Sequence, residues 1–94
     1  MSINTVYLSF STPPEVEKAA QIRFAKWLER GVRQQPRWKF RALGDTGATL
    51  TIAFDVNDED KGATGIVARS AGQRVIESAE QGWPGVKAVH ARVI

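Results

Sequence analysis

The sequence RWKFRALGDTGATLTIAFDV, from Arg37 to Val56, contains two runs of alternating residues around a short polar segment. In the first run Trp38 and Phe40 alternate with basic residues, and in the second run large apolar residues alternate with Thr, Ala and Asp. Alternation with a period of two is typical of strands that bury one face. The intervening segment GDTG, residues 44 to 47, consists of turn-forming residue types, so the stretch predicts a β-hairpin.

A strand and a helix are predicted before this hairpin. The run TVYLSFS, Thr5 to Ser11, alternates in the same way. Thr12 followed by Glu15 forms a capping box, which predicts a helix over residues 13 to 34 that ends before Pro36. The residues expected on the buried side of this helix are Val16, Ala20, Phe24, Trp27, Leu28 and Gly31.

A second helix and a fourth strand are predicted after the hairpin. The segment NDED offers Asn57 or Asp58 as an N-cap, and Gly82 followed by Pro84 predicts the helix end. The expected buried positions of this helix are Val67, Ala71, Val75 and Ala79. The run VKAVHARV, residues 86 to 93, alternates as a strand, with Val89, Ala91 and Val93 on its apolar side.

The predicted order β-α-β-β-α-β indicates an α+β fold of the ferredoxin-like, split βαβ type. Residues 1 to 94 are expected to form a single domain of this kind. Right-handed crossovers place both helices on one face of a four-stranded antiparallel sheet with the strand order 4-1-3-2. The other face of the sheet is then open to solvent or to a partner.

The composition indicates the cellular compartment and where a charged partner would bind. The 94 residues include no cysteine, no signal-peptide pattern and no membrane-length apolar run, so we expect a cytoplasmic protein. The net charge is only +3, but residues 18 to 41 hold eight of the 13 basic residues and one acidic residue, Glu29. Any charge-driven binding is therefore expected at a patch on the surface.

The open sheet face carries the first candidate binding surface. Its outward residues are expected to be Thr5, Tyr7, Ser9, Arg37, Lys39, Arg41, Thr49, Thr51, Ala53, Asp55, Ala88, His90 and Arg92. The predicted macromolecule-binding residues among them are Arg37, Lys39, Arg41, Tyr7, His90 and Arg92. The alternative is a solvated face whose basic residues protect an edge strand from aggregation.

A second basic stripe is predicted on the first helix. Arg23, Lys26, Arg30 and Arg33 are spaced by three and four residues, so they share one side of the helix. This stripe is a secondary candidate for docking on an acidic partner, and the alternative is an ordinary solvated helix face. It is expected on the layer opposite the open sheet face, too far for one flat ligand to cover both.

Enzymatic activity, cofactors and metal ions are not expected. His90 is the only histidine, and the segment DVNDEDKG, Asp55 to Gly62, departs from a calcium loop because Asp60 replaces its glycine. RNA-recognition domains share this topology, but their outward aromatic pair is missing here, since Phe54 is expected on the buried side and Tyr7 stands alone.

The periodicity of the helices and strands also predicts whether the tryptophans and the remaining apolar residues of the helices are buried or exposed. Trp27 and Trp38 are expected in the core. Trp83 either closes the end of the core, the favoured reading, or stands exposed as a binding anchor. The residues expected to lie off the buried stripes are Ile22, Ala25, Val32 and Ile76, and they suggest some exposed apolar surface.

The sequence thus predicts a small non-catalytic module that engages an acidic macromolecular surface. A protein partner is favoured over nucleic acid, because outward aromatic residues are scarce and the net charge is small. Nucleic acid remains an alternative partner through phosphate contacts. A further alternative is a homodimeric, ligand-responsive or structural module in which two copies pair through the open sheet face.

Overall fold

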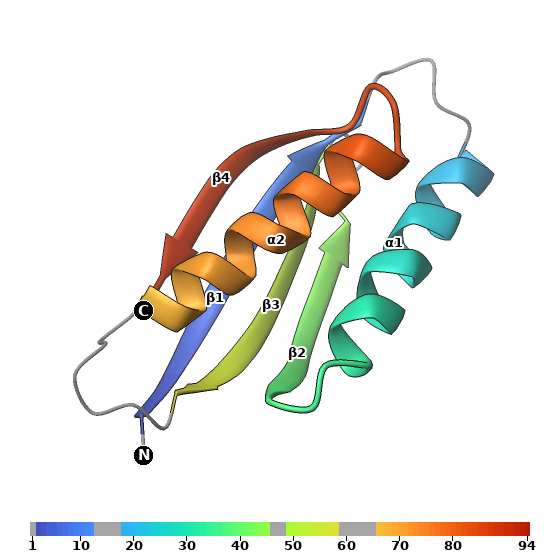
Figure 1. Cartoon of the computed structure of the whole chain (residues 1–94). Coiled ribbons are helices and arrows are strands. Elements are labelled where there is room, and N and C mark those ends of the chain that lie inside the picture. Colours follow the sequence, from blue (N-terminus) through green and yellow to red (C-terminus); the bar gives the residue numbers. More distant parts are fainter. Residues whose placement is uncertain (1, 13–17, 46–48, 59–65) are drawn as a thin grey trace.

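Six elements follow one another in the order β-α-β-β-α-β (Figure 1). The computed structural model describes residues 2–12, 18–45, 49–58 and 66–94. The elements are β1 (Ser2–Ser11), α1 (Lys18–Arg33), β2 (Trp38–Asp45), β3 (Thr49–Asp58), α2 (Ile66–Gly82) and β4 (Lys87–Val93). The expected capping box at Glu15 and the tip of the expected hairpin turn, residues 46 and 47, lie outside the described residues.

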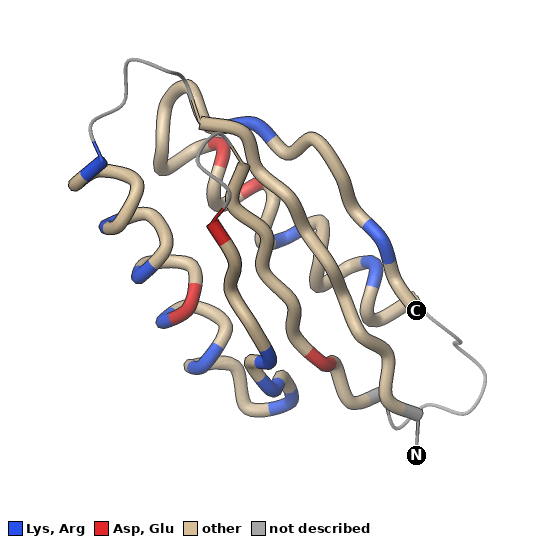
Figure 2. The backbone as a smooth tube through the Cα atoms, turned by 180° about the vertical axis from the view of Figure 1, so that it is seen from behind, with Lys and Arg blue, Asp and Glu red and all other residues tan. Residues whose placement is uncertain are grey.

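The four strands form one antiparallel sheet in the order β2-β3-β1-β4. Both helices lie on the same face of this sheet (Figure 1). Helix α1 packs on β2 and β3, whereas α2 packs on β1, β3 and β4. The opposite face has no described helix over it (Figure 2). The predicted α+β architecture, with two helices and a four-stranded antiparallel sheet, is therefore confirmed.

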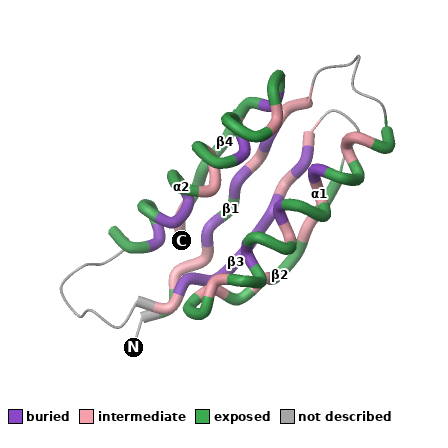
Figure 3. The backbone as a smooth tube through the Cα atoms, turned by 45° about the vertical axis from the view of Figure 1, so that its right-hand side comes forward, coloured by how far each residue is buried: buried purple, intermediate pink, exposed green. Residues whose placement is uncertain are grey.

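The core lies between the sheet and the helices (Figure 3). Inward side chains of β1 and β3 meet the buried side of α1, and the ring of Phe10 contacts that of Phe24 edge to face at 5.6 Å between centroids. Trp38 packs against this core and stacks on Phe54 at 4.9 Å, as expected from its place in β2. Trp83 packs on Phe24 at 5.3 Å, so it closes the end of the core.

The buried side of α1 differs from the prediction. Phe24, Leu28 and Val32 are buried, whereas Trp27 is 37% exposed and Gly31 is exposed. The exposed placement expected for Val32 is therefore wrong. The physical reason is that α1 lies over β2 and β3, beside the edge of the sheet, so its row at 24, 28 and 32 faces the strands. Trp27 and Gly31 instead face the space beside α2.

Helix α2 begins later than predicted. Strand β3 continues through Asp58, so Asn57 and Asp58 belong to a strand and do not cap the helix. The residues 59–65, which include the rest of the acidic segment, lie outside the described residues. The buried residues of α2 are Ala68, Ala71, Gly72 and Ala79, while Val67 is 39% exposed. Small residues dominate this face because the helix lies close to β1.

Two further corrections concern partly buried residues and the turn after α2. Ala25 and Ile76 pack against the core, although the sequence pattern placed both among the exposed apolar residues. The left-handed glycine is Gly85, with φ at 90°, and Gly82 is the last helical residue. The amide of Val86 donates to the carbonyl of Trp83 at 3.0 Å, which makes Trp83–Val86 a tight turn with Gly85 at its third position.

Each edge strand contains a β-bulge that changes which side chains face outward. In β4 the pairing with β1 shifts between Ser9 and Phe10, so Ala88 packs inward and Val89 is 59% exposed. The predicted orientations of Ala88 and Val89 are therefore reversed, because the extra residue of a bulge breaks the alternation. In β2 the shift falls between Phe40 and Ala42 and leaves Arg41 as the unpaired residue.

Candidate functional site

The residues expected on the open sheet face form two separate groups. Arg37 directly precedes β2, and Lys39 and Arg41 lie in that edge strand. His90 and Arg92 lie in β4 at the opposite edge, where Arg92 pairs with Tyr7 and His90 pairs with Ser9. Two strands separate the edges, which corresponds to about 14 Å at the usual strand spacing. The predicted binding residues of the sheet face therefore lie in two separate regions.

A hydrogen-bonded row crosses the sheet at Asp55 of β3. Thr5 Oγ1 of β1 donates to Asp55 Oδ1 at 2.7 Å, and Arg41 Nη1 of β2 donates to Asp55 Oδ2 at 3.0 Å. The Asp55 residue is only 8% exposed although it lies on the open face. The bulge in β2 allows Arg41 to reach it, since Lys39 occupies the paired position opposite Asp55.

This row controls the ionisation of Asp55. Burial alone raises the pKa of the carboxyl, because the charged form loses hydration. The hydrogen bonds from Thr5 and Arg41, together with the charges of Arg41 and Lys39, outweigh that effect and hold the pKa below its ordinary value. Asp55 is therefore ionised near neutral pH, and it neutralises much of the Arg41 charge that the sequence pattern assigned to binding.

Arg33 connects the basic stripe of α1 to strand β2. Its guanidinium lies over the ring of Phe40, 4.6 Å from the ring centroid, in a cation–π contact. It also forms an exposed ion pair with Glu29 at 3.3 Å. This contact brings the C-terminal end of the helix stripe against β2 on the helix layer, because α1 packs directly on β2.

The exposed basic residues at the end of α1 and in and just before β2 form a group that we call the basic rim, and it consists of Arg30, Arg33, Arg37, Lys39 and Arg41. Figure 2 shows basic segments spread along the whole of α1, and those at its C-terminal end lie near the basic segments at the start of β2. All five residues are exposed. Within the described residues, no carboxylate lies within ion-pair distance of Arg30, Arg37 or Lys39. Arg23 and Lys26 extend the same stripe along α1.

A hollow of about 250 Å³ lies beside the basic rim. Arg37, Lys39 and Asp55 line it together with Ile3 and Asn57. The Oδ1 atom of Asn57 is buried and accepts no hydrogen bond from the described residues. A side chain that inserts into this hollow therefore meets the cations of Arg37 and Lys39 and the carboxylate of Asp55.

The β1–β4 half of the open face is less charged. Ser9 and Thr51 hydrogen-bond to each other at 3.0 Å, and Tyr7 is 36% exposed beside Arg92. Ile3 and Ile94 are 62% and 60% exposed. Ile94 exchanges backbone hydrogen bonds with Thr5, so it continues the pairing of β4 with β1.

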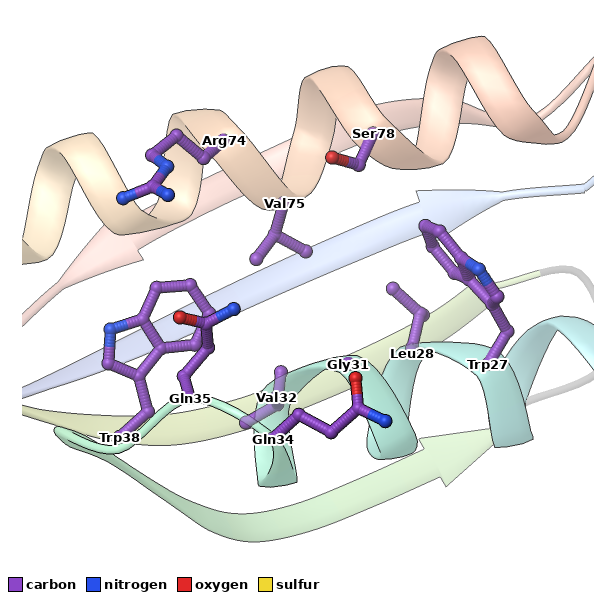
Figure 4. A pocket seen from close by; sticks show the side chains of 10 residues that line it. All are labelled: Trp27, Leu28, Gly31, Val32, Gln34, Gln35, Trp38, Arg74, Val75 and Ser78. Carbon is purple, nitrogen blue, oxygen red and sulfur yellow. The ribbon is translucent and has the colours of Figure 1, made fainter.

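The structure also contains a groove that the sequence pattern did not predict. It lies between α1 and α2 and has a volume of about 310 Å³ (Figure 4). Its apolar lining comes from Trp27, Leu28, Val32, Trp38 and Val75. Sequence reasoning missed it because Trp27 and Gly31 were assigned to the core. The exposed glycine within α1 was the only signal that could have indicated it.

The described residues do not assemble a metal centre. Within the part of the chain that the structure describes, no group of three or more His, Asp or Glu side chains is placed to hold a metal ion. No helix in that part is long and apolar enough to cross a membrane. Comparison of the sequence with protein-family models and with curated proteins finds no match. The functional proposal therefore rests on the surfaces described above.

Proposed function

We propose that this chain is a non-catalytic binding module whose basic rim docks on an acidic surface of a protein partner. The observation that carries the proposal is the Arg33–Phe40 contact, which brings a cation of α1 against the strand that carries Lys39 and Arg41. Among the described residues, three of the five rim cations have no acidic partner. Exposed cations without partners attract a complementary surface at low cost in desolvation.

We further propose that the fold is of the ferredoxin-like, split βαβ type. Read from the β4 edge, the strand order is β4-β1-β3-β2, the order expected for that fold. The position of both helices on one face is consistent with two right-handed crossovers (Figure 1). This fold hosts many functions, so it supports the architecture and does not identify the partner.

A protein partner is favoured over nucleic acid by the chemistry of the open face. Asp55 places a carboxylate beside Lys39 and Arg41, so it interrupts the row of positive charges that a continuous phosphate backbone would follow along β2. Tyr7, in β1, is the one aromatic side chain on the outer face among the described residues, so no second ring is available there for stacking bases. A protein carboxylate can approach Arg37 and Lys39 individually.

The proposal is tested with two variants that remove equal charge. The rim variant carries Arg37→Gln and Lys39→Gln, and Arg41 is left intact because its loss would leave Asp55 without its cation. The control carries Arg69→Gln and Lys87→Gln, two exposed residues in α2 and β4. Wild-type protein and both variants are immobilised, and the proteins that each retains from an extract of source cells are compared across a salt series.

We expect wild type and the control to retain the same acidic proteins and the rim variant to lose them. Retention should fall with added salt, because the contacts are exposed. Equal retention by the rim variant would rule out the basic rim as the docking surface. If wild type and the control bound random duplex DNA tightly and in a salt-dependent way, and the rim variant did not, the partner would be nucleic acid and not a protein.

The second candidate is a homodimer that pairs through the open sheet face. Ile3, Tyr7 and Ile94 favour it, because they expose apolar surface on the half of the face that is less charged. Light scattering at high concentration decides between the candidates. A measured mass of 10.4 kDa, that of one chain, would exclude the dimer. Twice that mass for wild type, together with the mass of one chain for Ile3→Glu, would establish the dimer.

A further inference from the structure

We propose that the groove between α1 and α2 binds a small organic carboxylate with an aromatic body. The groove lies on the helix layer, away from the open sheet face, and the proposal is independent of the partner of the basic rim. Figure 4 shows the indoles of Trp27 and Trp38 at its two ends and Val75 pointing into it from α2. Two indoles and three aliphatic side chains provide the apolar part of a lining that also contains Gln34, Gln35, Ser78 and Arg74, a combination that suits a ring compound with a polar group.

The charge of the lining identifies the head group of the ligand. Among the described residues that line the groove, Arg74 is the only charged one and none carries a carboxylate. Within the described residues Arg74 has no ion-pair partner. Its guanidinium extends along α2 toward the end of the groove that Trp38 occupies (Figure 4). A carboxylate there would accept charge-assisted hydrogen bonds from Arg74 while the ring of the ligand lies against the indoles.

The volume limits the size of the ligand. A cavity of about 150 Å³ accommodates a benzene ring. The groove holds about 310 Å³, which is enough for one aromatic ring and a short chain that ends in a carboxylate. Larger polycyclic compounds and lipids exceed this space.

Gly31 supplies an independent argument that the groove is kept open. A Cβ atom at this position of α1 would meet no heavy atom within 4 Å beyond the neighbouring residues and backbone of the helix itself. Close packing therefore does not require glycine here. A glycine inside a helix makes the helix less stable than an alanine would. Its presence on the wall of the groove is explained if a side chain at that position would occupy the space of the ligand.

The experiment follows the backbone and indole NMR signals of the ¹⁵N-labelled chain during titration with 3-phenylpropionate. The uncharged 3-phenylpropanol tests the head group, and acetate tests the charge without the ring. We expect saturable shifts of the Trp27 and Trp38 indole signals, with a dissociation constant of about 1 mM or lower for a ligand of this size. Acetate should produce no saturable shift.

Three variants locate the site. Arg74→Gln should weaken binding of 3-phenylpropionate about tenfold, because it removes a charge-assisted contact. Arg69→Gln removes an exposed arginine of the same helix that does not line the groove, and it should bind as wild type does. Gly31→Leu should abolish binding by filling the groove, with the dispersion of its NMR signals verifying the fold.

Four results would overturn the proposal. The first is the absence of a saturable shift with 3-phenylpropionate up to about 10 mM, a concentration well above the dissociation constant expected for a ligand of its size. The second is equal affinity for the acid and the alcohol, and the third is equal weakening of binding by Arg74→Gln and Arg69→Gln. The fourth is unchanged binding to folded Gly31→Leu. Equal affinity for the alcohol would identify a general apolar cleft, and unchanged binding to Gly31→Leu would place the ligand elsewhere.

Discussion

Arg41 reaches across a β-bulge to place its Nη1 atom 3.0 Å from Oδ2 of Asp55 in the neighbouring strand. The two residues are not cross-strand partners, since Lys39 pairs with Asp55. The arrangement is asymmetric, because the Arg41 side chain is 56% exposed and that of Asp55 only 11%. The carboxylate depends on this contact more than the guanidinium does, and this difference has measurable consequences for stability.

The free energy of unfolding should decrease in acid because of Asp55. The pKa of Asp55 in the folded chain lies below its ordinary value of 3.8, so its ionised form contributes stability at pH values above 3.8. That contribution is lost as the pH falls through the lower, folded pKa. Urea titrations from about pH 5 to about pH 2 should show a smaller loss of stability for Asp55→Asn than for wild type.

Two comparisons check that assignment. Arg41→Gln should also flatten the acid dependence, because it removes one of the interactions that lower the Asp55 pKa. Near neutral pH, Asp55→Asn should be less stable than wild type by about 1 to 2 kcal/mol. This value lies toward the lower end of the usual contribution of hydrogen bonds to charged groups. An Asp55→Asn chain with the same acid dependence as wild type would show that the Asp55 row does not produce it.

Gly31→Ala should stabilise the chain. The residue lies within α1, and its position offers open space to a Cβ atom. Alanine therefore gains helix propensity without a clash, and the free energy of unfolding should rise by about 0.5 to 1 kcal/mol. Urea denaturation followed by circular dichroism measures the change. A decrease would mean that α1 needs conformational freedom at this position.

Gly72→Leu should have the opposite effect. A Cβ at Gly72 would lie 3.3 Å from Cγ1 of Val6 and 3.6 Å from Cδ2 of Leu8, both in buried positions of β1. A leucine would push α2 away from the sheet, and overpacking of this kind costs about 1 to 3 kcal/mol. The same denaturation measurement applies, with Gly31→Leu as the control for adding a leucine to a helix. Equal effects of the two leucines would contradict the close contact between α2 and β1.

The element order was predictable from the sequence because the alternating runs and helical stripes are long. The strands β1 and β3 follow a strict period of two, and each buries the residues that the period indicates. The helix faces were predicted less well. Val32 was assigned to the wrong side because helical periodicity locates the buried face of a helix only to within about one residue on either side. The position of α1 at the β2 edge decides which row of its residues is buried.

The candidate surfaces were only partly predictable. The basic residues were identified, but the β-bulges and the contact of Arg33 with Phe40 depend on tertiary packing, which periodicity cannot reveal. The groove between the helices was missed for the same reason. Its walls come from residues that a helical pattern assigns to a core, and only the spacing of the two helices leaves them uncovered.

Trp83 should contribute to stability through its place at the end of the core. Its ring lies 5.3 Å from the Phe24 ring and 6.2 Å from the Trp27 ring, so Trp83→Ala removes contacts of a half-buried aromatic group. We expect a loss of about 2 kcal/mol, roughly half of the cost of truncating a fully buried tryptophan. Trp83→Phe should lose less than half as much, since a smaller ring can keep the contact with Phe24. If Trp83→Ala were as stable as wild type, the core would not depend on this closure, and the indole would be free to serve as a binding anchor.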